Sequence, residues 1–391
     1  MKTALVWDPS FGHYRFRADH PFNPKRLELT ISLIETLGLV GDGDNRLVAP
    51  RIATDEEILR VHDPEFVRAV KRVSRDDASE QDGCEWGLGS LDTPIFPGMH
   101  DAAAAVVGGT LKAAEMVMAG EVTRAFAIAG GLHHAHRNRA AGFCVYNDLA
   151  IAIDWVRSNY GARVMYIDYD AHHGDGVQEI FYDNPEVLTF SIHESGRYLF
   201  PSTGFVDELG EGDGYGYSLN LPMDPQTEDD SWLYCYREIL EEAADAFRPD
   251  VIVLQNGCDA HLLDPLSHLR GSTRLVEETV RITNSVADKH CGGRIIATGG
   301  GGYAIWRVVP RAWTLVWAGL TEQGAANAIP YSWLERWQGE SPYLLPPLLR
   351  DEQDSVRAAP RKRDVEAVNR QTMEDLRRRA MPLLRGWGME F

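Results

Sequence analysis

The chain has 391 residues, of which 44% are hydrophobic and 25% are charged, and its formal net charge is −19. This composition is typical of a globular protein with a large core, and the acidic balance argues against a broad basic face for nucleic acid or anionic lipid. Five widely spaced cysteines without a CxxC pair argue against a disulfide framework and indicate a reducing compartment. No apolar run is long enough for a signal peptide or a membrane span, so we expect a cytoplasmic protein.

The first 330 residues alternate between short apolar stretches with strand character and amphipathic stretches with helical character. In chain order we expect a strand at 3–7, a helix at 24–37, a capping box at 54–57, helices at 63–73 and 100–118, a strand at 124–129, a helix at 147–159, strands at 163–167 and 187–192, a helix at 231–247, a strand at 251–255, a helix at 273–289, a strand at 294–298 and a helix at 308–320. This alternation predicts a three-layer α/β fold, with a mainly parallel central sheet and helices on both faces. Residues 74–98 have the composition of a surface loop, and Gly108-Gly109 indicates close packing within its helix.

Residues 331–391 differ from the rest of the chain in pattern. A proline-interrupted stretch, SPYLLPPLL, precedes a return to helical spacing at 364–384. We therefore expect one catalytic domain at 1–330 and a C-terminal arm with a helix at 331–391, packed on that domain.

The stretch VMYIDYDAHHGDGV at 164–177 joins a buried strand to three acidic residues and two histidines. Asp168, Asp170 and His172 are two residues apart, so an extended backbone points their side chains the same way. Two carboxylates and an imidazole on one side of a strand end are unfavourable unless a cation lies between them. The stretch therefore indicates a metal site, with a polar turn or a structural ion-pair cluster as the alternative.

Four other predicted strand ends carry residue types that the same chemistry needs. The tandem His133-His134 follows strand 124–129, His193 follows 187–192, Asp259 follows 251–255, and GGGGY with Tyr303 follows 294–298. Sites in parallel sheets form beyond the carboxyl ends of the strands, so these side chains should meet. Each piece alone is a weak signal, since adjacent histidines are more often structural and a glycine run can be only a tight turn. Three further histidines are expected to lie outside the site, namely His136, His173 and His261.

Asp170, His172 and Asp259 have the ligand types and number of a catalytic zinc site with one open position. Such an ion lowers the pKa of bound water to about 7 and polarises a carbonyl. The residues available for the proton and the oxyanion are His133 and His134, oriented by carboxylates such as Asp168 or Asp175, and Tyr303. Together these groups indicate hydrolysis of an amide by metal-activated water.

Four motifs resemble the zinc-dependent histone deacetylase family in order and spacing. They are LHHAHRNRAAGFCVYND, DYDAHHGDGVQEIFYDNPEVLTFSIHESGRYLFPSTG, NGCDAHLLDPLSHL and TGGGGY. The opening HPFNPKRLELT and the closing YSWLERWQGESPYLLPP are similar to bacterial acetoin-utilization deacetylases in particular. The resemblance covers most of the chain and implies the arginase-deacetylase type of α/β fold.

The resemblance also implies roles for individual residues. It implies one Zn²⁺ on Asp170, His172 and Asp259, a general base at His134 backed by Asp175, an electrostatic partner at His133 backed by Asp168, and a carbonyl-polarising Tyr303. For the substrate it implies a narrow tunnel walled by Gly142, Phe143 and Phe200, a rim aspartate at Asp92, and Arg26 beside an internal channel for acetate. It implies structural K⁺ or Na⁺ in one site around Asp168, Asp170, His172, Ser191 and Ile192, and in a second near Phe181, Asn184, Val187 and Tyr217. Two residues depart from family patterns: Leu132 stands in place of a large aromatic, and Leu266 stands where polyamine-preferring relatives are acidic.

The expected function is removal of acetyl or other acyl groups from lysine side chains of proteins or peptides, with no nucleic-acid or membrane partner. Small acylamides or acetylpolyamines are the alternative substrates, and zinc or iron(II) the alternative metals. A ureohydrolase with two manganese ions could use the same scaffold, but the tandem histidines and GGGGY favour the deacetylase. A non-catalytic acetyl-lysine binder is disfavoured by the presence of Tyr303.

Overall fold

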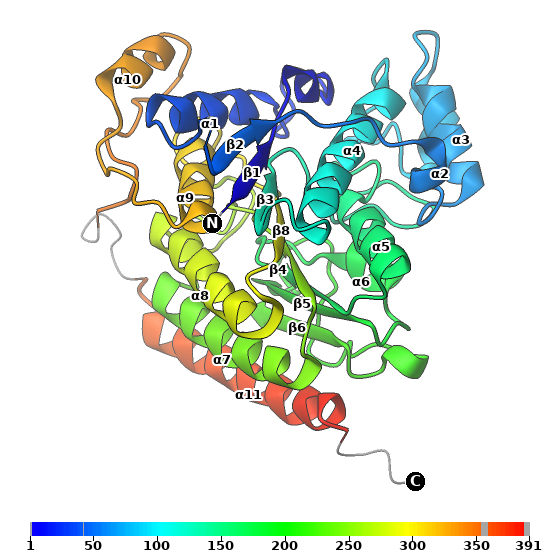
Figure 1. The fold of residues 1–391 in the computed structure, drawn as a ribbon, viewed down its shortest axis with the longest axis vertical. Helices are drawn as coiled ribbons and strands as arrows, with labels where there is room; N and C mark the ends of the chain where they lie inside the picture. The colour runs from blue at the N-terminus through cyan, green and yellow to red at the C-terminus, as the bar shows by residue number, and fades with distance from the viewer. Residues whose placement is uncertain (1, 42, 353–358, 387–391) are drawn as a thin grey trace.

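The computed structural model describes residues 2–41, 43–352 and 359–386, and the predicted parallel sheet lies at its centre (Figure 1). Its strands are β1 (Thr3–Val6), β2 (Asn45–Val48), β3 (Arg124–Ala127), β4 (Val164–Asp168), β5 (Val187–Glu194), β6 (Ser218–Met223), β7 (Val251–Gln255) and β8 (Ile295–Thr298). The strand order is β2-β1-β3-β8-β7-β4-β5-β6, and every neighbouring pair is parallel.

The two strands at the sheet edges, β2 and β6, are absent from the expectation. The sequence of β2 is NRLV, and its residues are half-buried or exposed, so it lacks the apolar run that marks the inner strands. The β6 strand contains Pro222, which argues against a central strand but is tolerated at an edge. Both strands extend the predicted sheet without changing its class.

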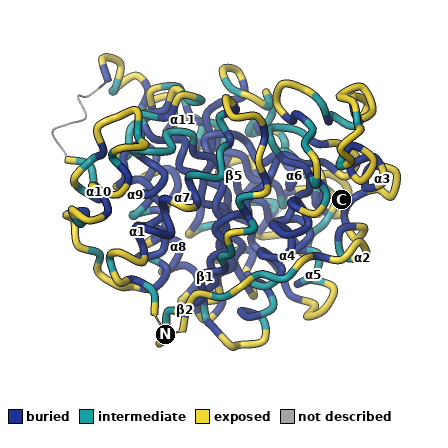
Figure 2. Tube along the Cα trace, turned by 90° about the horizontal axis from the view of Figure 1, so that it is seen from above, coloured by how far each residue is buried: buried dark blue, intermediate teal, exposed yellow. Residues whose placement is uncertain are grey.

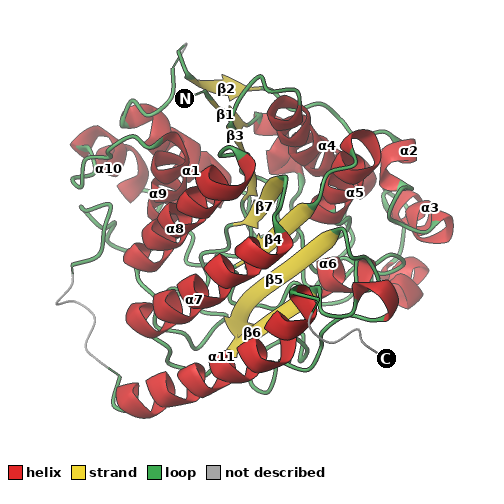
Figure 3. Ribbon diagram, turned by 60° about the horizontal axis from the view of Figure 1, so that its bottom comes forward, coloured by secondary structure: helices red, strands yellow, loops and turns green. Residues whose placement is uncertain are grey.

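Helices cover both faces of the sheet (Figure 3). They are α1 (Lys25–Thr36), α2 (Asp55–Ile58), α3 (Pro64–Val73), α4 (Met99–Met118), α5 (Asp148–Tyr160), α6 (Asp175–Ile180), α7 (Asp229–Phe247), α8 (Thr273–Cys291), α9 (Val309–Thr321), α10 (Tyr331–Gln338) and α11 (Lys362–Leu384). Helices α7, α8 and α9 contact one face of the sheet, and α4 and α5 contact the other. This is the predicted three-layer α/β arrangement, although the short helices α6 and α10 were not expected.

Three local expectations have clear outcomes. Thr54 and Glu57 form the predicted capping box at the start of α2. An added Cβ on Gly108 would lie 1.8 Å from the carbonyl oxygen of Arg51, so the glycine lets α4 pack directly on a neighbouring backbone, as expected. The segment 74–98, expected as a loop, contains a 3-10 helix at Glu80–Trp86.

The core is continuous from the sheet to its covering helices, and Figure 2 shows the buried residues along the strands with exposed loops around them. A smaller apolar cluster joins α10 to α1 and α9 through Trp333, Leu29 and Leu315. Helix α11 packs along α7 and β6, where buried Asn369 donates to the hydroxyl groups of Thr227 and Ser231. Among the described helices, none has both the length and the hydropathy that crossing a membrane requires.

The register aligns the carboxyl ends of the central strands in one row. Across β3, β8, β7, β4 and β5 the paired residues are Ala127, Thr298, Gln255, Asp168 and Ser191. The loops that carry the tandem histidines, Asp170 and His172, Asp259 and Tyr303 leave the sheet within a few residues of this row. The register therefore brings loops from distant parts of the sequence to one place.

Candidate active site

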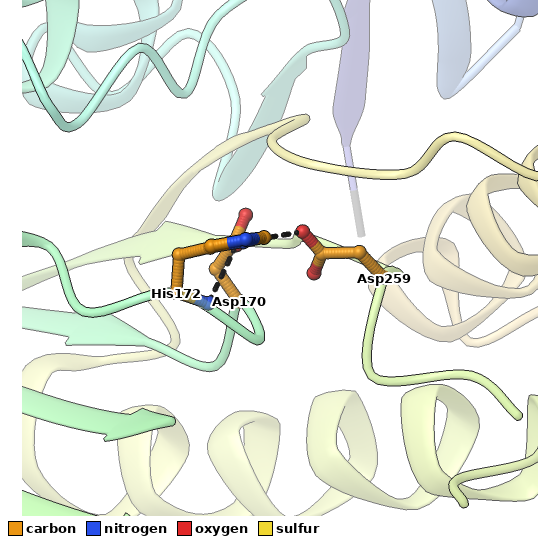
Figure 4. Close-up of side chains that lie close together, drawn as sticks. All are labelled: Asp170, His172 and Asp259. Atoms are coloured by element: carbon orange, nitrogen blue, oxygen red, sulfur yellow. Dashed lines mark hydrogen bonds and ion pairs between the residues drawn. The ribbon is translucent and has the colours of Figure 1, made fainter. Parts of the chain in front are cut away.

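The structure brings Asp170, His172 and Asp259 together at the carboxyl edge of the sheet (Figure 4). All three are buried, and one ligand atom from each lies within 4.8 Å of the others. Nδ1 of His172 lies 3.2 Å from Oδ1 of Asp170 and 3.0 Å from Oδ2 of Asp259. Among the described residues, this is the group of three or more histidine, cysteine or acidic side chains close enough together to hold a metal ion, and it is called the metal-binding group below.

The surroundings of this group fit a bound dication. Burial and the neighbouring Asp170 raise the pKa of Asp259 to about 7, because two buried carboxylates repel each other without a cation between them. The other oxygen of Asp170 accepts from the side-chain amide of Gln255 and the backbone N–H of Gly301, both at 2.7 Å. These bonds orient the carboxylate in the manner of outer ligand partners. A Cβ at Gly301 would lie 2.1 Å from Oδ2 of Asp259, so only glycine leaves the carboxylates their space.

Two histidine–aspartate pairs lie beside this group. Nδ1 of His133 donates to Asp168, and Nδ1 of His134 donates to Asp175, each at 2.7 Å. The His133 and His134 ring centroids are 4.0 Å apart, and the His134 ring lies 6.0 Å from that of His172. The pairing of each histidine with its aspartate is the one implied by the family resemblance.

The pKa values of the two histidines are shifted in opposite directions. Burial opposes the charge on His133, but Asp168 and Asp170 outweigh it and raise its pKa to about 9. Burial and the neighbouring charge of His133 lower the pKa of His134 to about 4. At neutral pH the site thus holds a cationic His133 next to a neutral His134.

His136, expected as a bystander, lies at the edge of the site. Its Nε2 is 3.4 Å from Oδ2 of Asp175, and its Nδ1 donates to Glu179. The two carboxylates overcome the effect of burial and raise the pKa of His136 to about 9. His173 and His261 follow the expectation, because they bond to Thr203 and Asp351, away from the metal-binding group.

The loop that carries Tyr303 crosses the site from the end of β8. Gly300 and Gly302 adopt φ angles of +156° and +146°, which favour glycine. Buried Arg26 donates to the carbonyl oxygens of both glycines, at 2.7 and 3.3 Å. Tyr303 extends from this loop toward Phe143, whose ring centroid is 5.6 Å from that of the tyrosine.

The residues implied in substrate binding lie around these groups. An added Cβ on Gly142 would lie 2.4 Å from the His134 ring, so glycine is needed for that contact. Phe200 packs edge-on against His134 with ring centroids 5.0 Å apart, and Phe200 itself is exposed to solvent. Asp92 and Phe200 line a cleft of about 790 Å³, and Asp175 and His136 also line it. Leu266 is half-buried in the loop after Asp259.

This geometry can be compared with known proteins. The sequence pattern of the family described as "Histone deacetylase domain" matches residues 20–320. The chain is 48% identical over 371 residues to the acetoin utilization protein AcuC of Bacillus subtilis (strain 168), which covers 95% of this chain and 95% of that protein. The chain belongs to the histone deacetylase family.

Further relatives of the deacetylase agree with this assignment. AcuC of Staphylococcus xylosus is 40% identical over 368 residues, covering 94% of this chain and 95% of that protein. The crystal structure of an HDAC homolog from Aquifex aeolicus superimposes with a TM-score of 0.84 at 30% identity, covering 95% of this chain and all of that one. An HDAC homolog complexed with SAHA gives the same TM-score at 31% identity. The resemblance in the sequence motifs and the predicted fold are therefore confirmed, and the chain is a deacetylase-family hydrolase of the AcuC type.

The residues implied in monovalent-cation binding are near one another in the deacetylase. Asp168 and Ser191 are register partners on β4 and β5, next to the metal-binding group. In the second set, the backbone N–H of Asn184 donates to Phe181, and that of Val187 donates to Asn184. Tyr217 accepts from Thr189 on the adjoining strand. The first set thus adjoins the Asp170, His172 and Asp259 group, and the second lies at the start of β5.

Several residues that bond to the candidate site residues were not predicted from the sequence. Tyr166 donates to Asp168 from two residues upstream, and Asp148 accepts from the backbone N–H groups of Gly131 and Leu132 just before the tandem histidines. Buried Asp264 accepts from the backbone N–H of Tyr303. Buried acidic residues inside quoted motifs were the available signal, since a buried carboxylate needs donors. The identity of those donors depends on contacts between loops, which the sequence pattern does not specify.

Proposed function

We propose that this deacetylase is zinc-dependent and hydrolyses N-acetyl or other N-acyl groups on lysine side chains of proteins or peptides. The observation that carries the proposal is the meeting of a buried Asp-His-Asp group with two histidine–aspartate pairs of opposite proton affinity. A metal-binding group alone fits many reactions. A neutral base and a cation beside it fit a hydrolysis in which a proton moves while negative charge develops.

The proposed ligands of one zinc ion per chain are Asp170, His172 and Asp259. Zinc in such a site supplies a Lewis acid for the amide carbonyl and makes water a nucleophile near neutral pH. Two carboxylates would balance its charge in a buried place, where an unpaired dication is unfavourable. The same donor set would also hold iron(II).

The remaining residues act directly on the proton and on the developing charge. Neutral His134 would accept the proton of the attacking water at Nε2 and later deliver it to the leaving amine, while Asp175 holds the ring through Nδ1. Cationic His133, held by Asp168, would stabilise the negative charge that forms on the amide oxygen. The Tyr303 hydroxyl would donate a hydrogen bond to the same oxygen.

The proposed substrate contacts are outside the reacting centre. Phe143 and Phe200 would contact the methylene stem of the lysine, Gly142 would keep the wall thin beside His134, and Asp92 would bind the substrate backbone at the rim. A cleft of about 790 Å³, lined by Asp92 and Phe200, lies beside the rim, where the backbone of a peptide substrate would lie. Apolar Leu266 disfavours a charged polyamine.

Two further assignments belong to this proposal. Structural K⁺ or Na⁺ ions would occupy the set around Asp168 and Ser191 and the set around Asn184 and Tyr217. Residues 1–330 would form the catalytic domain, and 331–391 an arm whose helices α10 and α11 brace it from outside.

The decisive experiment measures acetate release from an acetyl-lysine peptide together with metal content. We expect release by the isolated protein, loss of release after chelation, recovery with Zn²⁺, and close to one zinc per chain. An unchanged rate after complete metal removal would reject the metal role. Two metals per chain, with urea released from guanidino substrates, would support the ureohydrolase alternative, and peptide binding without turnover would support the silent binder.

A glycine substitution tests the ligand set without measuring activity. Gly301→Ala should reduce zinc content strongly, because the new Cβ would lie 2.1 Å from Oδ2 of Asp259. Gly324→Ala is the matched control, since its Cβ would meet no atom within 4 Å and should leave the zinc content unchanged. Full zinc content in Gly301→Ala would place the metal elsewhere.

A further inference from the structure

Tyr303 lies in a segment without regular structure. It follows four glycines, and its loop runs from the end of β8 to the start of α9. Glycine chains have large conformational freedom, so a hydroxyl that must meet a substrate atom needs outside contacts to fix it. Arg26 holds the loop at the carbonyl oxygens of Gly300 and Gly302. The backbone N–H groups of Tyr303 and Ala304 bond to a different residue.

That partner is Asp264, which comes from the loop after β7. Its Oδ2 accepts from the backbone N–H of Tyr303 at 2.7 Å and from that of Ala304 at 3.2 Å. Its Oδ1 accepts from the backbone N–H of Leu266 at 3.0 Å. The residue is 7% exposed. One buried carboxylate therefore joins the backbone of the proposed carbonyl-polarising residue to that of Leu266, a proposed substrate contact.

The contacts are well suited to fixing a backbone. Hydrogen bonds to an ionised carboxylate are shorter and stronger than those between neutral groups, and one oxygen that accepts two successive N–H groups restrains the chain direction at both. Burial raises the pKa of Asp264 to about 6 against the effect of these N–H groups, so the ionised form predominates at neutral pH. In the described part of the chain, no other side chain bonds to the backbone N–H of Tyr303.

We infer that Asp264 is a positioning residue for Tyr303, and that its carboxylate sets the place of the tyrosine hydroxyl by holding the backbone at 303 and 304. The inference rests on the proposed function, because it concerns how Tyr303 reaches the amide oxygen. Among the described residues, the side chain of Asp264 makes no hydrogen bond to Asp170, His172 or Asp259, and its bonds to Leu266, Tyr303 and Ala304 are to backbone N–H groups.

A double-mutant cycle separates positioning from general stability. Asp264→Ala is measured in the wild-type chain and in the Tyr303→Phe chain, with kcat and KM for one acetyl-lysine peptide. In the wild-type chain we expect kcat to fall about tenfold or more, because a displaced catalytic group loses rate steeply with distance. In the Tyr303→Phe chain we expect kcat to fall less than about threefold, since the hydroxyl that Asp264 positions is already absent. A change in KM through Leu266 should be the same in both chains.

A conservative variant and a control complete the cycle. Asp264→Asn keeps the side-chain shape and one carbonyl oxygen, so its kcat should lie between those of wild type and Asp264→Ala; it also runs the cycle if the alanine variant does not fold. Asp229→Ala is the control, because Asp229 likewise ties two segments by accepting from the N–H and hydroxyl of Ser272, without contact to Tyr303. Its effect on kcat should be equal in both chains.

The outcomes are distinguishable from those of the proposed function. Equal losses of kcat on Asp264→Ala in the two chains would overturn the positioning role, even with zinc-dependent acetate release intact. A wild-type rate in Tyr303→Phe would overturn it as well, because Asp264 could then not act through the hydroxyl. Absence of acetate release by the wild-type chain with zinc would instead reject the proposed function.

Discussion

His133–Asp168 and His134–Asp175 are neighbouring pairs with one hydrogen-bond length, 2.7 Å, and they differ in what surrounds each carboxylate. Asp168 is fully buried and has the second anion of Asp170 nearby, so the field at His133 is strongly negative. Asp175 also forms an ion pair with a second imidazole, because Nε2 of His136 lies 3.4 Å from its Oδ2. A histidine–carboxylate hydrogen bond therefore does not by itself decide whether the histidine is charged.

The comparison shows how one site can hold a base and a cation at the same pH. The pKa of His133 lies at about 9 and that of His134 at about 4, although the rings are 4.0 Å apart. Burial and the neighbouring charge of His133 together lower the pKa of His134. Pairs of titratable groups whose pKa values are driven apart are the usual basis of acid and base roles.

The largest expected effect comes from exchanging each histidine for alanine. His134→Ala should lower kcat/KM by about 10³-fold, within the range of a general base, whereas His133→Ala removes only charge stabilisation and should cost about 10²-fold or less. The measurement is acetate release from an acetyl-lysine peptide at neutral pH, with zinc content checked for each variant.

A structural histidine provides the control for this pair. His261 is buried and bonds to Asp351 at 2.9 Å, so His261→Ala should reduce the melting temperature and leave kcat/KM close to that of wild type. A greater loss in His133→Ala than in His134→Ala would reverse the two roles.

A smaller effect should come from the extra imidazole on Asp175. His136→Gln removes a cation next to that carboxylate, which should raise the pKa of His134. Since His134 acts as a base only when neutral, the acid limb of the pH profile of kcat/KM should move to higher pH, by about one unit or less. His290→Gln, at a histidine paired with Asp245 on the surface, should leave the limb in place. An unmoved limb in His136→Gln would show that His136 does not influence the base.

The inner part of the fold was predictable because its residues repeat a simple pattern. The strand β4, with every residue buried and apolar residues before Asp168, is visible in the sequence, and its parallel neighbours follow from the alternating helices. The edge strand β6 carries Pro222 and was missed, because an edge position tolerates what a central one does not. Local patterns therefore identified the strands on which the site is built but not the edges of the sheet.

Within the site, too, contacts between residues close in the sequence were predictable and contacts between distant loops were not. Asp170 and His172 are two residues apart in the bend that follows β4, so their meeting is a local feature of the sequence. The bond from Gln255 to Asp170 and the bond from Tyr303 to Asp264 join loops that lie far apart in the sequence. His136 was set aside because the sequence around it gives no indication of its partners, and its contact with Asp175 depends on how α6 packs.

The smallest expected effect concerns stability and tests the charge state of His136 directly. The ordinary pKa of histidine is about 6.5, which describes the unfolded chain. In the folded protein Asp175 and Glu179 raise it to about 9. The folded state then binds more protons between these values, so the contribution of His136 is complete below the lower value and is lost as the pH rises through the higher one. The difference in melting temperature between wild type and His136→Gln should accordingly be largest in mild acid and shrink toward pH 9. His290→Gln should not show this decline, because burial lowers the pKa of His290 instead of raising it. A constant difference in His136→Gln would mean that the imidazole next to Asp175 is uncharged, and the contrast between the two pairs would then rest on His133 alone.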